Sequence, residues 1–104
     1  MSVVERPDGS ELALEGEIDI AVADELRAAG ARALAVLPPG ARLNIDMAAV
    51  RFIDSSGIGA LVSIRNAATP SGSTVALLNT PTEILRLFEL TGLLESFMFL
   101  PATV

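Results

Sequence analysis

The sequence predicts an α/β fold: a mixed sheet of about five strands, with an N-terminal antiparallel hairpin, parallel β-α-β units after it, and helices packed on the sheet. An Asp-Gly pair between two short apolar runs near the N-terminus is a strong hairpin signal. Segments of helical periodicity then alternate with short apolar runs, which calls for parallel strands joined by right-handed crossovers. The length of 104 residues predicts a single domain over residues 1–104 with its own core.

The hairpin is predicted from Val3 and Val4 on one side and residues 12–14 on the other, with the turn at residues 6–10. The second strand then runs into an acidic loop at residues 15–19 (EGEID), whose glycine permits a sharp turn. Two interpretations of this loop stay open. It is either a solvated connection to the next helix or a recognition element.

The first helix is predicted from about Ile20 to Leu37, because apolar residues recur there at spacings of three and four. Its acids come early and its arginines later, an order that complements the helix dipole. The Pro-Pro-Gly run at residues 38–40 ends it. Gly30 in the helix interior is expected to cost about 1 kcal/mol relative to alanine.

Leu43, Ile45 and Met47 alternate with polar residues, as in a strand buried mainly on one face. A second apolar patch at residues 50–53 leads to a strand-to-helix junction. The second helix is predicted from residue 55 or 56 to residue 68.

The junction from Phe52 to Gly59 (FIDSSGIG) combines an acid, two hydroxyls and two glycines. A helix N-terminus favours an anion, so a phosphate on Ser55 or Ser56 is expected to sit well there. The small residues of the first turns indicate either close packing of helix on sheet or clearance for a partner that approaches Ser55. We expect this junction and the acidic loop to share one rim, since both follow the carboxyl ends of strands.

The C-terminal part of the chain completes the pattern. Residues 74–78 form a nearly continuous apolar run that fits a central strand buried on both faces. Residues 80–83 (TPTE) read as a capping box with proline at the first helical position, and Gly92 fits the end of that third helix. Residues 97–100 predict a last strand, which Pro101 ends.

The composition excludes several classes of function. The chain has no cysteine and no histidine, its seven basic residues are all arginine, and its net charge is −6. Disulfides, thiolate sites, most zinc sites and the common nucleophilic triads are therefore excluded, and we predict no enzyme, no cofactor and no metal site. The acidic balance argues against direct nucleic-acid binding. Without a signal peptide or an apolar run of about 20 residues, we expect no membrane insertion and a cytoplasmic protein.

The order of elements and four stretches together resemble a STAS domain, most of all the free-standing bacterial anti-sigma factor antagonists. The stretches are residues 15–19, 43–46, 52–59 and 87–93 (EGEID, LNID, FIDSSGIG and LFELTGL). The likeness covers nearly the whole chain. The combination is more specific than Asp-Ser-Ser-Gly alone, which is also an ordinary turn and cap sequence.

The resemblance implies a regulator of transcription, for example in a stress response, without catalysis of its own. The unphosphorylated protein would bind an anti-sigma factor that is also a serine kinase, and so free the sigma factor. That kinase binds the ATP and phosphorylates the first serine after the acid, here Ser55, and a metal-dependent serine phosphatase reverses the step. The partner-binding residues that it implies are Glu17, Asp19, Asp54, Ser55, Ser56, Gly57 and Ile58.

Alternatives remain open for the residues and for the function. Ser55 is either the phosphoacceptor or only the N-cap of the second helix, and Asp54 is either a turn acid or the group that orients the Ser55 hydroxyl or the partner. The nearest rival function is a STAS module that is never phosphorylated and serves as a scaffold, bound to a transporter ATPase or another regulatory complex. A receiver-like phosphoacceptor at Asp46 or Asp54 is disfavoured because the chain lacks lysine.

Overall fold

A five-stranded mixed sheet with the order β1-β2-β3-β4-β5 is the centre of the computed structural model, which describes residues 1–101. The antiparallel pair of β1 and β2 forms the N-terminal hairpin, and the remaining neighbours are parallel. The strands span Ser2–Glu5 (β1), Glu11–Ile18 (β2), Arg42–Ile53 (β3), Thr74–Leu78 (β4) and Met98–Leu100 (β5). The predicted fold class and order of elements are confirmed.

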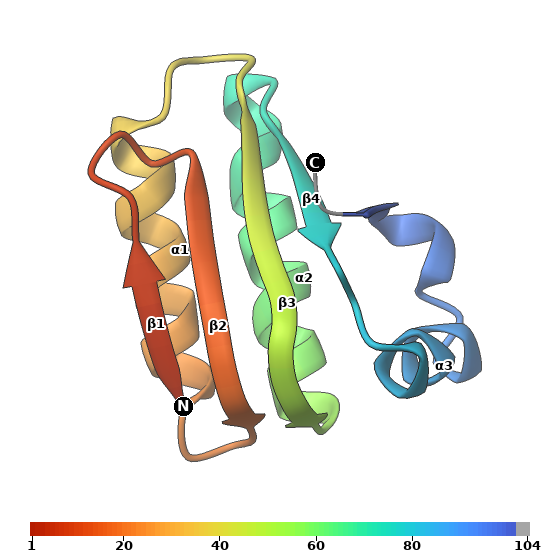
Figure 1. The fold of residues 1–104 in the computed structure, drawn as a ribbon. Coiled ribbons are helices and arrows are strands. Elements are labelled where there is room, and N and C mark those ends of the chain that lie inside the picture. The colour runs from red at the N-terminus through yellow and green to blue at the C-terminus, as the bar shows by residue number, and fades with distance from the viewer. Residues whose placement is uncertain (102–104) are drawn as a thin grey trace.

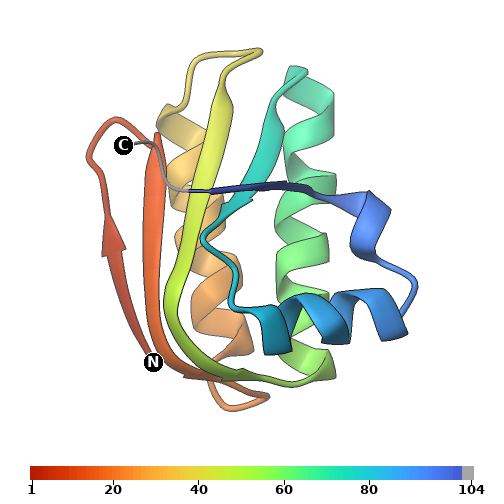
Figure 2. The same ribbon diagram turned by 45° about the vertical axis from the view of Figure 1, so that its right-hand side comes forward.

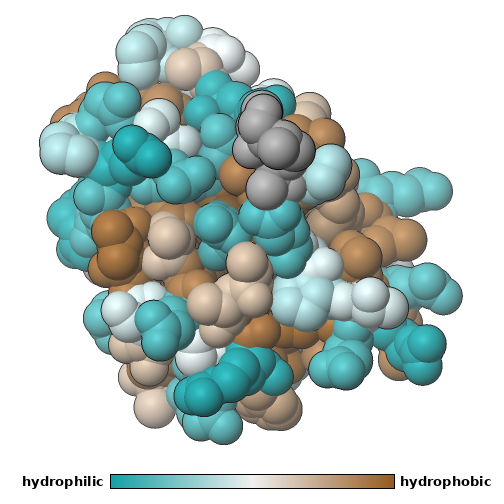
Figure 3. Space-filling model, viewed as in Figure 1, coloured by the Kyte–Doolittle hydropathy of each residue, from teal (hydrophilic) through white to brown (hydrophobic). Residues whose placement is uncertain are grey.

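Two long helices cover one face of the sheet. α1 (Ala23–Val36) and α2 (Ser55–Ala68) lie side by side behind the strands in Figure 1. α3 (Thr82–Leu90) lies beside the sheet, and β5 crosses steeply relative to the other strands in Figure 2. The opposite face of β1 to β3 carries no helix within residues 1–101, and hydrophilic and hydrophobic side chains are intermixed on it (Figure 3).

The core fills the layer between the sheet and these two helices. Alternate residues of β2 and β3 face inward and are fully buried, as the two-residue period of a strand requires. One stripe of each helix meets them. The largest buried side chains of this layer are Leu12, Leu14, Ile18, Leu26, Leu43, Ile45, Met47, Ile53 and Leu61. β4 is buried on both faces over residues 75–78, as predicted.

Gly30 lies inside the continuous helix α1 for a packing reason. A Cβ atom at this position would lie 2.4 Å from Cγ1 of Ile64 on α2. The glycine therefore permits the close approach of the two helices, which offsets its expected cost in helix propensity.

The prediction of an acidic loop at residues 15–19 is wrong for most of this segment, because β2 continues to Ile18. Gly16 does have a positive φ of 92°, but it pairs with Val50 of β3 in the parallel ladder. Shifts of register flank it, between Ala13 and Glu15 and between Gly16 and Glu17. The glycine thus serves a β-bulge, which adds residues on β3 without ending β2.

The apolar patches predicted separately at residues 43–47 and 50–53 belong to one strand of 12 residues, β3, which continues through these register shifts. Inward-facing residues follow at spacings of two up to Met47 and then at spacings of three, at Val50 and Ile53. A bulge changes the face that successive residues point to, so the alternation looks broken in the sequence while the strand continues.

Two predicted helix starts are also wrong. α1 begins at Ala23 and not at Ile20, because residues 19–22 form a turn in which the Val22 N–H donates to the Asp19 carbonyl at 3.1 Å. α3 begins at Thr82, with Pro81 as its N-cap and no capping side chain. The Thr80 hydroxyl is buried without a hydrogen-bond partner, so the capping box does not form.

The predicted end of α3 is confirmed, whereas the last strand begins one residue later than expected, at Met98. Gly92 has a φ of 74°, and the N–H of the residue after it, Leu93, donates to the Phe88 carbonyl at 2.8 Å. This is the left-handed termination that favours glycine.

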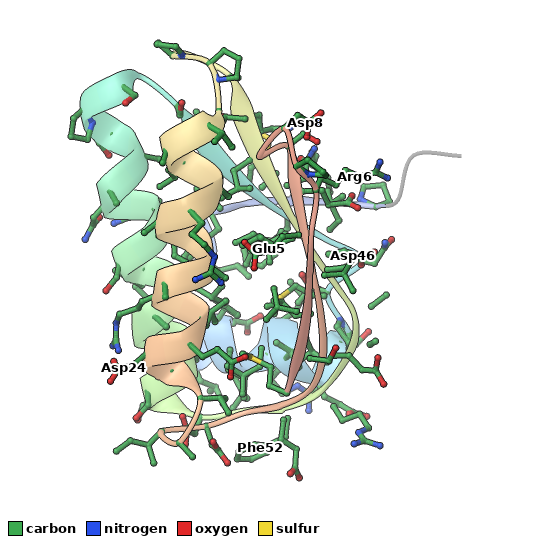
Figure 4. All side chains as sticks on the ribbon, turned by 90° about the vertical axis from the view of Figure 1, so that its left-hand side faces the viewer. Glu5, Arg6, Asp8, Asp24, Asp46 and Phe52 are labelled. Atoms are coloured by element: carbon green, nitrogen blue, oxygen red, sulfur yellow. The ribbon has the colours of Figure 1, made fainter. Side chains whose placement is uncertain are left out.

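An exposed ion pair fixes the edge strand β1 to α1. Arg32 donates two hydrogen bonds to the Glu5 carboxylate, at 3.0 and 2.9 Å, and Figure 4 shows Glu5 between the strand and the helix. These bonds hold the pKa of Glu5 below its ordinary value. The hairpin is thereby attached to α1.

Candidate functional site

The predicted site residues gather at the carboxyl ends of β2 and β3. Ile18 and Ile53 are paired in the parallel ladder, and the Asp54 N–H donates to the Ile18 carbonyl at 3.2 Å. The connection from β2 to α1 and the connection from β3 to α2 therefore lie at the same end of the sheet, the lower end in Figure 1. The shared rim expected from the topology is present.

Asp54 is the N-cap of α2. Its Oδ1 atom accepts hydrogen bonds from the backbone N–H groups of Ser56, at 2.9 Å, and Gly57, at 3.0 Å. The backbone of Asp54 is extended while its carbonyl already accepts from the Ile58 N–H at 3.0 Å. The alternative that Ser55 is the N-cap is therefore wrong, because the neighbouring carboxylate takes that role.

Ser55 is the first residue of α2, and it is exposed. Its hydroxyl makes no hydrogen bond to any other group of residues 1–101. A modifying enzyme can therefore reach the Oγ atom without opening the fold. Asp54 occupies two of the N–H groups that an anion at the helix N-terminus would use, those of Ser56 and Gly57. The favourable position for a phosphate at this helix end stays a prediction.

The two glycines of the junction have different environments. A Cβ atom on Gly57 would lie 2.6 Å from the Ile18 carbonyl oxygen and 2.6 Å from Cγ1 of Ile53. A Cβ atom on Gly59 would meet nothing within 4 Å. The packing interpretation of the small first turns is thus confirmed at Gly57. The open space at Gly59 is compatible with clearance for a partner, which stays a prediction.

The other predicted partner-binding residues divide by exposure. Glu17 is exposed on β2, in register with Phe52 of β3, and Ser56 is partly buried. Asp19 fixes the connection to α1, because its Oδ1 atom accepts from the Ala21 N–H at 3.0 Å. Ile58 is only 5% exposed and belongs to the core, so its side chain packs beneath the surface of the junction.

Two apolar residues at this rim were not predicted from the sequence to be exposed. Ile20 is 78% exposed and Phe52 is 49% exposed. Ile20 falls at the start of the predicted first helix and Phe52 in the apolar patch at residues 50–53, and neither position predicts an exposed apolar side chain. Only the turn at residues 19–22 and the bulges of β3 direct the two side chains outward.

Removing the cap should weaken α2 by a measurable amount. We expect Asp54→Ala to lower the free energy of unfolding by about 1 kcal/mol, because two helix N–H groups lose their acceptor. Asp54→Asn keeps an acceptor oxygen and should lose much less. Urea denaturation of the two variants checks this, and equal losses would mean that the charge of Asp54, and not its cap, stabilises the helix.

No group of three or more acidic residues in the described part of the chain is arranged to hold a metal ion. None of the helices of residues 1–101 is long and apolar enough to cross a membrane.

Comparison with known proteins gives a consistent result. The model of the family described as "Mlab, STAS domain" matches residues 1–101. The anti-sigma-B factor antagonist of Bacillus subtilis (strain 168) is 32% identical over 80 residues, which are 77% of this chain and 71% of that protein.

Solved structures share the fold at lower identity. The anti-sigma factor antagonist SpoIIAA in its unphosphorylated form superposes with a TM-score of 0.74 at 18% identity, covering 98% of this chain and 88% of the other. Bacillus SpoIIAA in the phosphorylated form gives 0.72 at 20% identity, with 98% and 92% covered. A sulfate transporter family protein of Wolinella succinogenes gives 0.73 at 19% identity, with 93% and 80% covered.

Proposed function

Because this chain belongs to the STAS domain family, we propose that it is an anti-sigma factor antagonist controlled by phosphorylation of Ser55. In its unphosphorylated form it binds an anti-sigma factor that is also a serine kinase, and the sigma factor is released. The kinase transfers the γ-phosphoryl group of its ATP to Ser55, and a serine phosphatase removes it. The chain itself acts by binding in the cytoplasm and catalyses nothing.

The observation that carries this proposal is that Asp54, and not Ser55, caps α2. Asp54 satisfies the N–H groups of Ser56 and Gly57, so the Ser55 hydroxyl is not needed to cap the helix. A hydroxyl that is exposed and has no structural task is free to attack the γ-phosphorus atom. In that step the bond to the β,γ-bridging oxygen breaks, ADP leaves, and the hydroxyl proton is taken up by the kinase or by solvent.

The switch is electrostatic in this proposal. A phosphate adds about 1.5 to 2 negative charges, and Asp54 already occupies the N–H groups of Ser56 and Gly57 at the start of α2. The phosphate therefore remains directed outward, next to one carboxylate and on the rim of Glu17 and Asp19. A partner that covers Ser55 would have to desolvate this charge without a compensating cation from this chain. Binding is lost while the fold stays the same.

Intact mass with phosphosite mapping, on protein purified from its own organism, tests the proposal. We expect one added phosphate on Ser55 in part of the population, changing with growth and stress conditions. Protein that stays unmodified under all conditions would contradict the phosphorylation switch.

The scaffold function has one observation in its favour. The fold is shared with a sulfate transporter family protein of Wolinella succinogenes, so the same architecture occurs outside sigma-factor control. A scaffold would bind a transporter ATPase or another regulatory complex constitutively, and its affinity would not depend on Ser55. Binding that is indifferent to the state of Ser55 would favour this second function.

A further inference from the structure

Ile20 is displayed to solvent by an ordered turn. It follows β2 by two residues, and its side chain is 78% exposed. The turn is held from both sides of Ile20, by the Ala21 N–H on the Asp19 carboxylate and by the Val22 N–H on the Asp19 carbonyl. The exposure of this large aliphatic side chain is thus a property of the folded loop, and it opposes the hydrophobic effect unless another surface covers it.

Phe52 is displayed at the same end of the sheet from the neighbouring strand. It lies three residues before Ser55, is 49% exposed, and pairs in register with Glu17. Figure 4 shows Phe52 at the end of the sheet where the chain turns from β2 into α1. Aromatic residues, Phe among them, are enriched in protein interfaces relative to the rest of the surface.

The charges around these two residues are mainly negative. Glu17, Asp19 and Asp54 lie at this end, and none of them forms an ion pair within residues 1–101. Arg51, next to Phe52 in the sequence, forms no ion pair with these carboxylates within residues 1–101. The other ion pairs of the structure, such as Arg32 with Glu5, use their acids internally. The unpaired carboxylates are therefore available to a cationic partner.

We propose that Ile20 and Phe52 anchor the anti-sigma factor kinase beside Ser55, and that the kinase meets them with an apolar recess flanked by lysine or arginine side chains. The inference rests on the proposed function, because the occupant is the same kinase. It adds a second element to the site. The apolar pair supplies affinity, the carboxylates supply charge complementarity, and the state of Ser55 decides whether the two surfaces can close.

The test uses the full chain and the purified anti-sigma factor kinases of its organism, of which the one that binds the native chain is retained. We expect Ile20→Ala and Phe52→Ala each to weaken binding about fivefold, as truncation of an interface anchor does. Val36→Ala is the matched control, because Val36 is 56% exposed and lies at the opposite end of α1. It should bind within about twofold of the native chain.

Two further variants test the contribution of the carboxylates to binding. Glu17→Gln should weaken binding about twofold and reduce its dependence on salt, because one carboxylate leaves the rim. Glu95→Gln, which alters an exposed carboxylate of the 3-10 turn Leu94–Ser96, should change neither quantity. Thermal unfolding of the Ile20, Glu17, Val36 and Glu95 variants should match that of the native chain, since these side chains are exposed. For Phe52→Ala, whose side chain is half-buried, thermal unfolding separates a loss of binding from a loss of stability.

The outcomes separate this inference from the proposed function. If a kinase binds but the Ile20 and Phe52 variants bind like Val36→Ala, the anchor is wrong while the proposed function stands. If no kinase of the organism binds the native chain, the proposed function fails, and the inference about its occupant fails with it.

Discussion

Ser55→Asp binds the kinase partner at least about tenfold more weakly than the native chain, whereas Ser55→Ala binds as tightly as the unphosphorylated protein and cannot be switched off. This is the expected result because tenfold corresponds to about 1.4 kcal/mol, which an unpaired charge at a closing interface readily exceeds. Asp54 already occupies the N–H groups of Ser56 and Gly57, so these two groups do not neutralise the carboxylate of the variant. We expect that carboxylate to face the partner.

Titration calorimetry of both variants with the purified kinase measures the effect. Ser63→Asp is the control, because Ser63 is an exposed serine of the same helix two turns further along. This control should bind normally. Ser55→Asp should also unfold at the native temperature, since an acid in the first turn of a helix is favourable. Native affinity in both Ser55 variants would show that Ser55 is not the switch.

The fold could be predicted from local signals that survive in the folded chain. The Asp-Gly hairpin, the alternation of Leu43, Ile45 and Met47, and the terminal Gly92 each depend on a few neighbouring residues. The arrangement of the site followed from topology alone, because carboxyl ends of neighbouring parallel strands meet at one edge. Ser55 and Asp54 were thus placed correctly beside the end of β2.

The errors came from contacts between segments that are distant in the sequence. Pairing with β3 extends β2 through Gly16, and no local pattern reports a bulge that adds residues on the partner strand. The capping box failed because the Thr80 hydroxyl is buried and makes no hydrogen bond to the helix. The exposure of Ile20 and Phe52 depends on the same tertiary features. For this reason the most apolar part of the rim could not be predicted from the sequence.

Gly57→Ala should destabilise the protein by about 2 kcal/mol, although alanine is the better helix former. The added Cβ atom would lie 2.6 Å from the Ile18 carbonyl oxygen, a backbone atom held in the sheet, and 2.6 Å from Cγ1 of Ile53. Overpacking of this kind costs about 1–3 kcal/mol, and a site formed partly by backbone relaxes little. The gain of about 1 kcal/mol in helix propensity offsets only part of it.

Gly59→Ala is the matched control, because it makes the same substitution two residues later in the same helix, where a Cβ atom meets nothing within 4 Å. It should stabilise the protein by up to about 1 kcal/mol. Urea denaturation compares the two variants, and hydrogen exchange of the Asp54 amide shows whether α2 has moved away from the Ile18 carbonyl. Faster exchange is expected in Gly57→Ala alone. If both alanines stabilised the protein equally, the close contact between α2 and the end of β2 would be wrong, and with it the geometry that presents Ser55.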